Sequence, residues 1–134
     1  MRRLVALTFF TCVSAWAQDT PLPETEKSAI EYKSIPEALA GLRAKPGTEI
    51  SNQGGWTIAI EPDTKVIWSF APESHPAYPA LVKRAVVSQN GSVFVKMDVK
   101  CQASKSACDA LVREFIQLNE KMRSSFQSKE NKQE

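Results

Sequence analysis

The chain has 134 residues, of which 43% are hydrophobic and 24% are charged, a composition that is typical of a folded domain and excludes disorder throughout. Its formal net charge of +2 is due to Arg2 and Arg3, because the remainder carries 15 basic residues (17 minus these two) and 15 acidic ones. This balance argues against binding of nucleic acid through bulk charge, which requires a net basic surface.

Residues 1–17 have the pattern of a secretory signal peptide. Two arginines are followed by an apolar run of about a dozen residues and by Ala15-Trp16-Ala17, which has the A-x-A form of a cleavage site. The apolar run is too short to cross a bilayer core of about 30 Å. We therefore expect cleavage before Gln18 and a mature protein that is periplasmic or secreted and has no transmembrane segment.

Export changes what the cysteines are expected to do. Cys12 leaves with the signal peptide, whereas Cys101 and Cys108 enter an oxidising compartment in which two cysteines are expected to pair. We therefore predict a disulfide between Cys101 and Cys108. The C-x6-C spacing is unlike a zinc site, and the only histidine cannot complete a set of four ligands. Neither a metal nor another cofactor is expected.

The mature chain is expected to start with a mobile lead-in over residues 18–33, which are mostly polar. A single domain then covers residues 34–126. Ser34 followed three residues later by Glu37 has the pattern of a capping box, and apolar residues recur at helical spacing until Pro46-Gly47. These signals predict a short helix at the start of the domain.

After this helix the apolar residues alternate with a period of two, which predicts antiparallel strands. Residues 56–61 and 66–70 are expected to form a hairpin, and residues 49–51 can form a brief additional strand. The aromatic residues of the hairpin are expected to share one face of the sheet.

A second hairpin is predicted from residues 81–88 and 92–101, because Asn90-Gly91 is a strong signal for a two-residue turn. Arg84 then lies on the apolar side of the hairpin. Two interpretations stay open: its side chain extends to water near the end of the sheet, or it anchors an anion or a partner carboxylate. The turn also sets the register, and the expected cross-strand pairs are Gln89 with Ser92, Val86 with Val95, Arg84 with Met97, Lys83 with Asp98 and Val82 with Val99.

The last predicted element is a helix of about twenty residues, which Ser104 or Ser106 can cap and which buries an apolar stripe from Cys108 to Met122. Residues 127–134 are expected to form a polar tail. The predicted fold class is α+β: an antiparallel sheet of about four strands, with the short N-terminal helix and the longer C-terminal helix packed on one face.

The sequence lacks the catalytic signatures G-x-S-x-G, H-E-x-x-H and a glycine-rich phosphate loop before a helix. Glu61 and Asp63 flank a turn, so we expect them to face solvent and not to act as an acid–base pair. The favoured hypothesis is a non-enzymatic interaction module of the cell envelope, such as an accessory factor, an inhibitor or an immunity-type protein, with another protein as its partner.

The residues expected to bind this partner lie in and beside a proline-rich loop: His75, Tyr78, Lys83 and Arg84. Phe94 and Val87 would add an apolar patch on the outward side of the second hairpin. Two alternatives remain, which are binding of a small ligand or glycan on an exposed Trp56 or Trp68 and an enzyme of unrecognised type. The sequence does not determine the oligomeric state.

Several segments together resemble small exported proteins of Gram-negative bacteria. In addition to the signal peptide, they are A-L-A-G-L-R-A-K-P-G, G-G-W-T-I, W-S-F-A-P, H-P-A-Y-P-A-L-V-K-R and the C-x6-C helix. The resemblance implies a periplasmic location. It implies no activity, since none of these segments is a catalytic signature.

Overall fold

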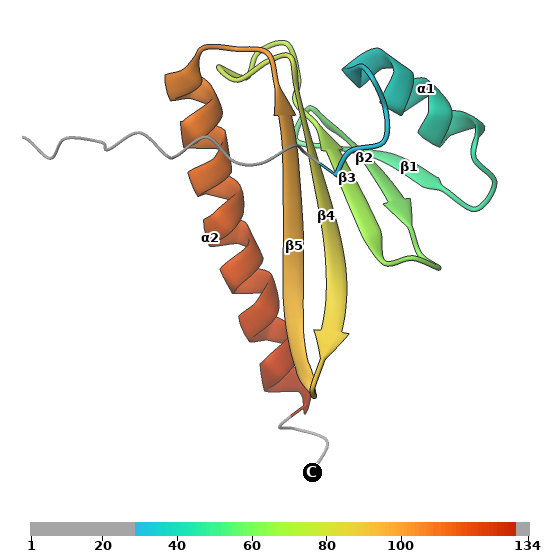
Figure 1. Ribbon diagram of the computed structural model, residues 1–134, viewed down its shortest axis with the longest axis vertical. Helices are drawn as coiled ribbons and strands as arrows, with labels where there is room; N and C mark the ends of the chain where they lie inside the picture. Colours follow the sequence, from blue (N-terminus) through green and yellow to red (C-terminus); the bar gives the residue numbers. More distant parts are fainter. Residues whose placement is uncertain (1–28, 131–134) are drawn as a thin grey trace, which may run out of the picture.

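The computed structural model describes residues 29–130, which form one antiparallel sheet and two helices (Figure 1). In chain order the elements are α1 (Ile35–Ala44), β1 (Glu49–Gln53), β2 (Trp56–Glu61), β3 (Val66–Phe70), β4 (Ala80–Gln89), β5 (Ser92–Cys101) and α2 (Lys105–Glu130). Each strand pairs with the next one along the chain, so the order in the sheet is β1-β2-β3-β4-β5. The predicted α+β class is confirmed, with five strands in place of about four because β1 pairs along its whole length.

The expected signal peptide and most of the expected lead-in lie outside the described residues. The end of the expected lead-in, residues 29–33, packs on the sheet. Ile30 is buried, the Ala29 N–H donates to Asp98 Oδ1 at 3.1 Å, and Lys100 Nζ donates to the Lys33 carbonyl at 3.1 Å. The polar tail expected over residues 127–134 overlaps the end of α2, which continues to Glu130.

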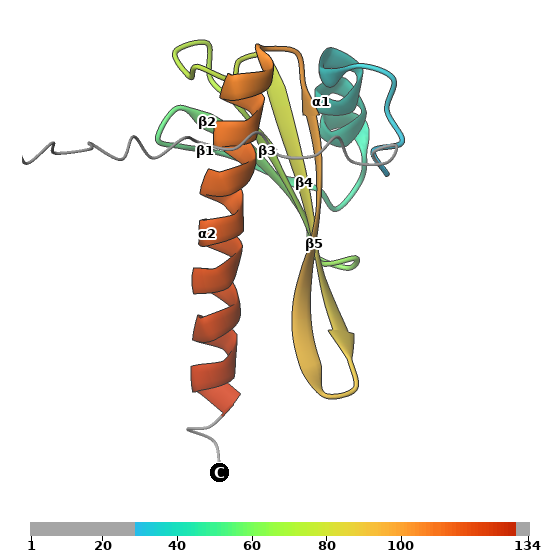
Figure 2. The ribbon, with the colours of Figure 1, turned by 60° about the vertical axis from the view of Figure 1, so that its left-hand side comes forward.

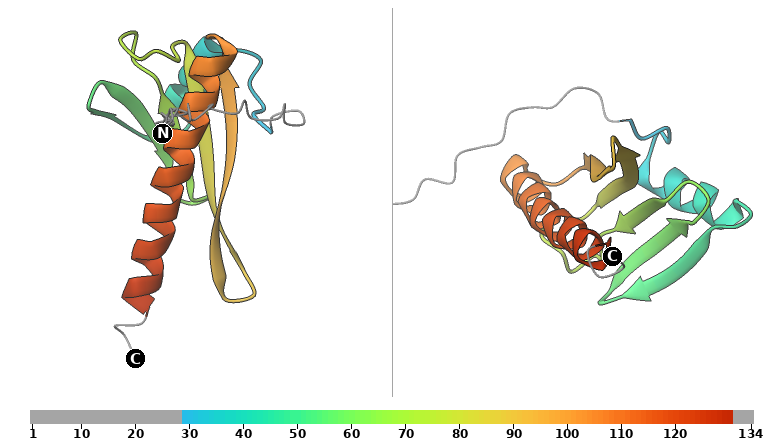
Figure 3. Two further views of the ribbon diagram at one scale, coloured as in Figure 1. Left: turned by 90° about the vertical axis from the view of Figure 1, so that its left-hand side faces the viewer. Right: turned by 90° about the horizontal axis from the view of Figure 1, so that it is seen from below.

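The two helices cover opposite faces of the sheet, and not one face as expected (Figure 2; Figure 3, right). Alternate residues of a strand point to opposite faces, and both sets of positions in β4 are apolar, so each face needs a cover. The buried residues of the α1 side are Ile30, Ala38, Leu42, Ala59, Val66, Trp68, Phe70 and Leu81. Those of the α2 side are Ala71, Ala77, Ala80, Val82, Leu111 and Phe115.

The β4–β5 hairpin has the predicted register, and all five predicted pairs are confirmed. Asn90 and Gly91 have φ angles of 53° and 76°, which is the left-handed geometry that a two-residue turn of type I′ requires. The N-caps of both helices also come from serines next to the helix in the sequence. Ser34 Oγ accepts from the Glu37 N–H at 3.2 Å, and Ser104, one of the two candidates for α2, accepts from the Ala107 N–H at 3.2 Å.

The β2–β3 hairpin does not place its aromatic residues on one face. Glu61 pairs with Val66, and this register puts Ala59 opposite Trp68. Trp56 is three positions from Ala59, an odd number, so its side chain points to the α2 side while Trp68 points to the α1 side. Apolar residues do alternate along each strand. Which residues of the two strands share a face, however, depends on the length and geometry of the turn between them.

The predicted disulfide is present and joins the end of β5 to the first turn of α2. The Cα atoms of Cys101 and Cys108 are 5.9 Å apart. Farther along, α2 runs beside the β4–β5 hairpin (Figure 1). Among the described residues, neither helix combines the length and the apolar character that crossing a membrane requires.

Candidate functional site

His75, the first of the residues expected to bind a partner, holds the proline-rich loop against the sheet and α2. Its Nδ1 accepts from the Ala77 N–H at 3.1 Å, so a neutral imidazole carries its proton on Nε2, which lies 3.5 Å from Glu114 Oε2. Its ring makes an edge contact with Trp56, with centroids 5.0 Å apart. His75 therefore contributes to the packing of the loop.

The four expected residues do not all lie on one surface. Tyr78 is 44% exposed in the loop. Lys83 faces the α1 side, where it pairs with Glu31 at 2.8 Å and lies 4.8 Å from the centre of a Trp68 ring. Arg84, the next residue of β4, points to the opposite face. The structure therefore separates Lys83 and Arg84 by the thickness of the sheet.

Arg84 is buried beneath α2 with 6% of its surface exposed. The interpretation that it extends to water near the end of the sheet is wrong, because it lies in the middle of β4 opposite Ile67 and Met97. Its guanidinium carbon is 5.1 Å from the centre of the Phe115 ring. Nε and Nη1 have no hydrogen-bond partner among the described residues, and burial lowers the pKa of the guanidinium.

The two tryptophans considered for ligand binding differ in accessibility. Trp68 is fully buried, donates from Nε1 to Glu61 Oε1 at 2.6 Å and makes an edge contact with Tyr32. A side chain with no exposed area offers no surface to a ligand, so Trp68 is not a ligand platform in this fold. Trp56 is half-buried between His75 and Phe115.

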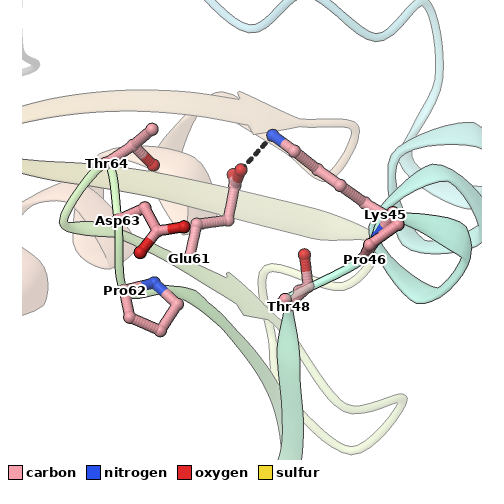
Figure 4. Close-up of a pocket in the computed structure, with 8 residues that line it drawn as sticks. Lys45, Pro46, Thr48, Glu61, Pro62, Asp63 and Thr64 are labelled. Carbon is pink, nitrogen blue, oxygen red and sulfur yellow. Dashed lines mark hydrogen bonds and ion pairs between the residues drawn. The ribbon is translucent and has the colours of Figure 1, made fainter.

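Glu61 is also buried, contrary to the expectation that it faces solvent, whereas Asp63 is exposed as expected. Both oxygens of the Glu61 carboxylate have partners. Oε1 accepts from Trp68 Nε1. Oε2 accepts from Lys45 Nζ (Figure 4). This hydrogen bond raises the pKa of Lys45. The adjoining cavity of about 110 Å³ extends from Lys45 to Thr48 and from Glu61 to Thr64. Glu61 thus ties the end of α1 to the sheet and leaves no free carboxylate oxygen for acid–base chemistry.

A larger groove lies between β5 and α2. It has a volume of about 360 Å³, and we call it the edge groove; its lining residues are Phe94, Val95, Asn119, Glu120 and Arg123. Phe94 is 45% exposed, and Ile116, which precedes Glu120 by one helical turn on the same side of α2, is 46% exposed. Asn119 Oδ1 and Arg123 Nε are buried without a hydrogen-bond partner in the part of the chain that the structure describes. The groove thus presents apolar side chains together with unused polar atoms.

The edge groove lies at the outer edge of the sheet beside Phe94 and Val95, because β5 is the last strand of the sheet that residues 29–130 form. A two-residue turn is closed by a hydrogen-bonded pair, here Gln89 with Ser92, and such pairs alternate along an antiparallel ladder. The backbone N–H and C=O groups of every second residue of β5 therefore point away from β4. These residues are Val93, Val95, Met97 and Val99.

Only part of this site had a signal in the sequence. The sequence predicts Phe94 as an outward apolar residue. It does not predict that β5 is the last strand or that α2 lies beside it, because both depend on the order of the strands in the sheet. Among residues 29–130, no three His, Cys, Asp or Glu side chains are grouped so that they could hold a metal ion. Among protein-family models, curated proteins and solved structures, none matches this chain.

Proposed function

We propose that this protein is a non-enzymatic interaction module of the bacterial cell envelope that binds an extended segment of a partner protein along β5. The edge groove carries this proposal, since it combines the outer edge of β5, which pairs with no other strand among the described residues, with an adjoining apolar hollow. An extended segment that pairs with β5 would use the free N–H and C=O groups as a sixth strand. The location in the envelope is proposed from the signal-peptide pattern of residues 1–17.

The side chains next to β5 indicate what kind of segment would fit. Residues of an added strand that face α2 would lie against Val95 and Ile116, so apolar side chains are favoured there. Residues that face the other side would lie beside Phe94 and Lys96, both exposed. Opposite charges pair favourably across strands, so an acidic residue is favoured beside Lys96. The expected segment therefore alternates apolar residues with polar ones, at least one of them acidic.

The proposal is tested by removing one free N–H of β5. Val95→Pro removes a donor that points away from β4, and proline is tolerated on edge strands. Val95→Thr is the matched control, because it keeps the N–H and a similar shape. We expect affinity capture from an envelope extract to recover a partner with the wild type and with Val95→Thr, but not with Val95→Pro or with Ile116→Glu.

A second control tests whether the effect is specific to this edge. Ile50 is 38% exposed on β1, the opposite edge strand, so Ile50→Glu introduces the same charge away from the groove and should leave capture unchanged. Equal recovery of every partner by all variants would refute strand addition at β5. The protein recovered from the envelope fraction is expected to begin at Gln18, which N-terminal sequencing of the same sample checks.

A further inference from the structure

The Arg84 side chain leaves hydrogen-bonding capacity unused inside the protein. Its Nε carries one N–H and its Nη1 carries two, and neither atom has a partner among the described residues. The two carboxylates of α2 that are nearest in sequence to Phe115, the residue that Arg84 contacts, are engaged elsewhere: Glu114 faces His75, and Glu120 pairs with Arg123 at 2.8 Å. On α2, Arg84 contacts the Phe115 ring, and its Nε and Nη1 bond to no carboxylate among the described residues.

Other unused polar atoms lie on the same side of the sheet. Ser69 Oγ is buried and has no partner among the described residues, and Ser69 follows Ile67, the β3 neighbour of Arg84, on the same face. On β5, the neighbour of Arg84 is Met97, whose sulfur accepts from Asn119 Nδ2 at 3.5 Å, while Asn119 Oδ1 is unused. Two elements, β3 and α2, thus bring unused polar atoms to the side of the sheet on which Arg84 is buried.

We propose that Arg84 anchors a carboxylate between the sheet and α2. A carboxylate carries one negative charge and neutralises the guanidinium, whereas a doubly charged phosphate would leave a net charge in a buried place. It accepts several hydrogen bonds at once, which suits the free N–H groups of Arg84 and the hydroxyl of Ser69. Ile67, the β3 neighbour of Arg84 on the same face, is only half-buried, so the surface beside Arg84 is partly accessible there.

The carboxylate has two possible sources, a small free acid or an acidic side chain of a partner. The second source rests on the proposed interaction function, but the first does not require a strand on β5. Because Val95 and Arg84 are changed in separate experiments, failure of strand addition and failure of the carboxylate site are distinguishable.

The first experiment measures thermal unfolding of the purified chain in sodium acetate, whose anion has one negative charge, and in sodium chloride of equal ionic strength. Wild type is compared with Arg84→Met, which removes the guanidinium but keeps an unbranched apolar stem, and with Arg43→Met, which removes the same charge from an exposed position. At about ten times its dissociation constant, acetate should raise the unfolding midpoint of the wild type and of Arg43→Met by roughly 6 to 10 °C, and that of Arg84→Met not at all.

The second experiment uses a capped five-residue peptide with a central Glu and the same peptide with Gln in its place. An Arg84-dependent preference for the Glu peptide without a response to acetate assigns the carboxylate to a partner, and a response to acetate supports a free acid. Arg84→Lys keeps the charge but loses the planar fork of donors, so it should retain only part of either response. If neither probe binds, or if Arg84→Met responds as the wild type does, the proposal is wrong.

Discussion

At the scale of single residues, Glu61 and Arg84 show two different environments for a buried charge. Both oxygens of Glu61 have partners, Trp68 and Lys45. Arg84 has the Phe115 ring as its neighbour and unused donors. Burying an unpaired ion costs several kcal/mol, whereas a desolvated cation–π contact returns about 2 kcal/mol. We therefore expect Arg84 to lower the stability of the folded protein when no carboxylate is bound.

This balance predicts the effect of replacing Arg84. In the absence of carboxylates, Arg84→Met should have a free energy of unfolding equal to that of the wild type or higher by about 1 to 2 kcal/mol. Urea denaturation measures this difference. The exposed control, Arg43→Met, should lie within about 0.5 kcal/mol of the wild type. A loss of more than about 2 kcal/mol in Arg84→Met would contradict the assignment, because it would show that the guanidinium is well paired.

At the scale of elements, α2 is attached to the sheet most firmly near its start. Cys108 bonds to Cys101 in the first turn, and Leu111 and Phe115 are buried against the sheet. Farther along, α2 lies beside the part of the β4–β5 hairpin that no third strand joins, because β3 pairs with β4 only from Leu81 to Ala85. Figure 2 shows this end of the hairpin projecting beyond the other strands. Leu118 and Phe126 accordingly stay 43% and 40% exposed.

The disulfide is expected to make a measurable but limited contribution to the attachment of α2. The two cysteines are only seven positions apart, so removing the bond should lower the free energy of unfolding by about 2 kcal/mol on the chain-entropy estimate. The double variant Cys101→Ser, Cys108→Ser tests this in urea. A reducing agent should lower the stability of the wild type by a similar amount and leave the double variant unchanged. Equal stability of oxidised wild type and double variant would contradict this role.

At the scale of the whole molecule, residues 29–33 connect the start of the described chain to its last hairpin. Ile30 enters the core beside α1, and the polar contacts reach Lys83, Asp98 and Lys100 across 52 to 69 positions of the sequence. Glu31 takes part through Lys83. Partial burial alone would raise the pKa of Glu31, but the hydrogen bond and charge of Lys83 outweigh it, so this pKa lies below its ordinary value of 4.5.

The direction of this shift predicts a pH dependence. A carboxyl group whose pKa is lowered by folding stabilises the fold above its unfolded pKa, and this contribution is lost as the pH falls through the lower, folded value. The unfolding midpoint of the wild type should therefore exceed that of Glu31→Gln near pH 7, by a small margin because Glu31 is largely exposed. The two midpoints should converge below pH 4.5, the ordinary value. A difference that stays constant between neutral and acid pH would rule out the ion pair as its cause.

Features encoded within a few residues could be predicted from the sequence. The pair Asn90-Gly91 determined the register of β4 and β5, because its left-handed geometry allows one turn type. The N-cap at Ser34 and the disulfide between Cys101 and Cys108 likewise join residues that are close in the sequence. The faces of Trp56 and Trp68 could not be predicted in this way, since they depend on the phase between two strands.

By itself the sequence determined the fold class, the last hairpin, the helix starts and the disulfide, because each depends on neighbours in the chain. Only the tertiary structure decided that the helices cover opposite faces, that Lys83 and Arg84 are separated by the sheet, and that β5 is an open edge beside α2. These properties depend on which elements meet in space. Arg84 illustrates the difference, since the turn placed it on the apolar side, but only the position of α2 made it a buried cation.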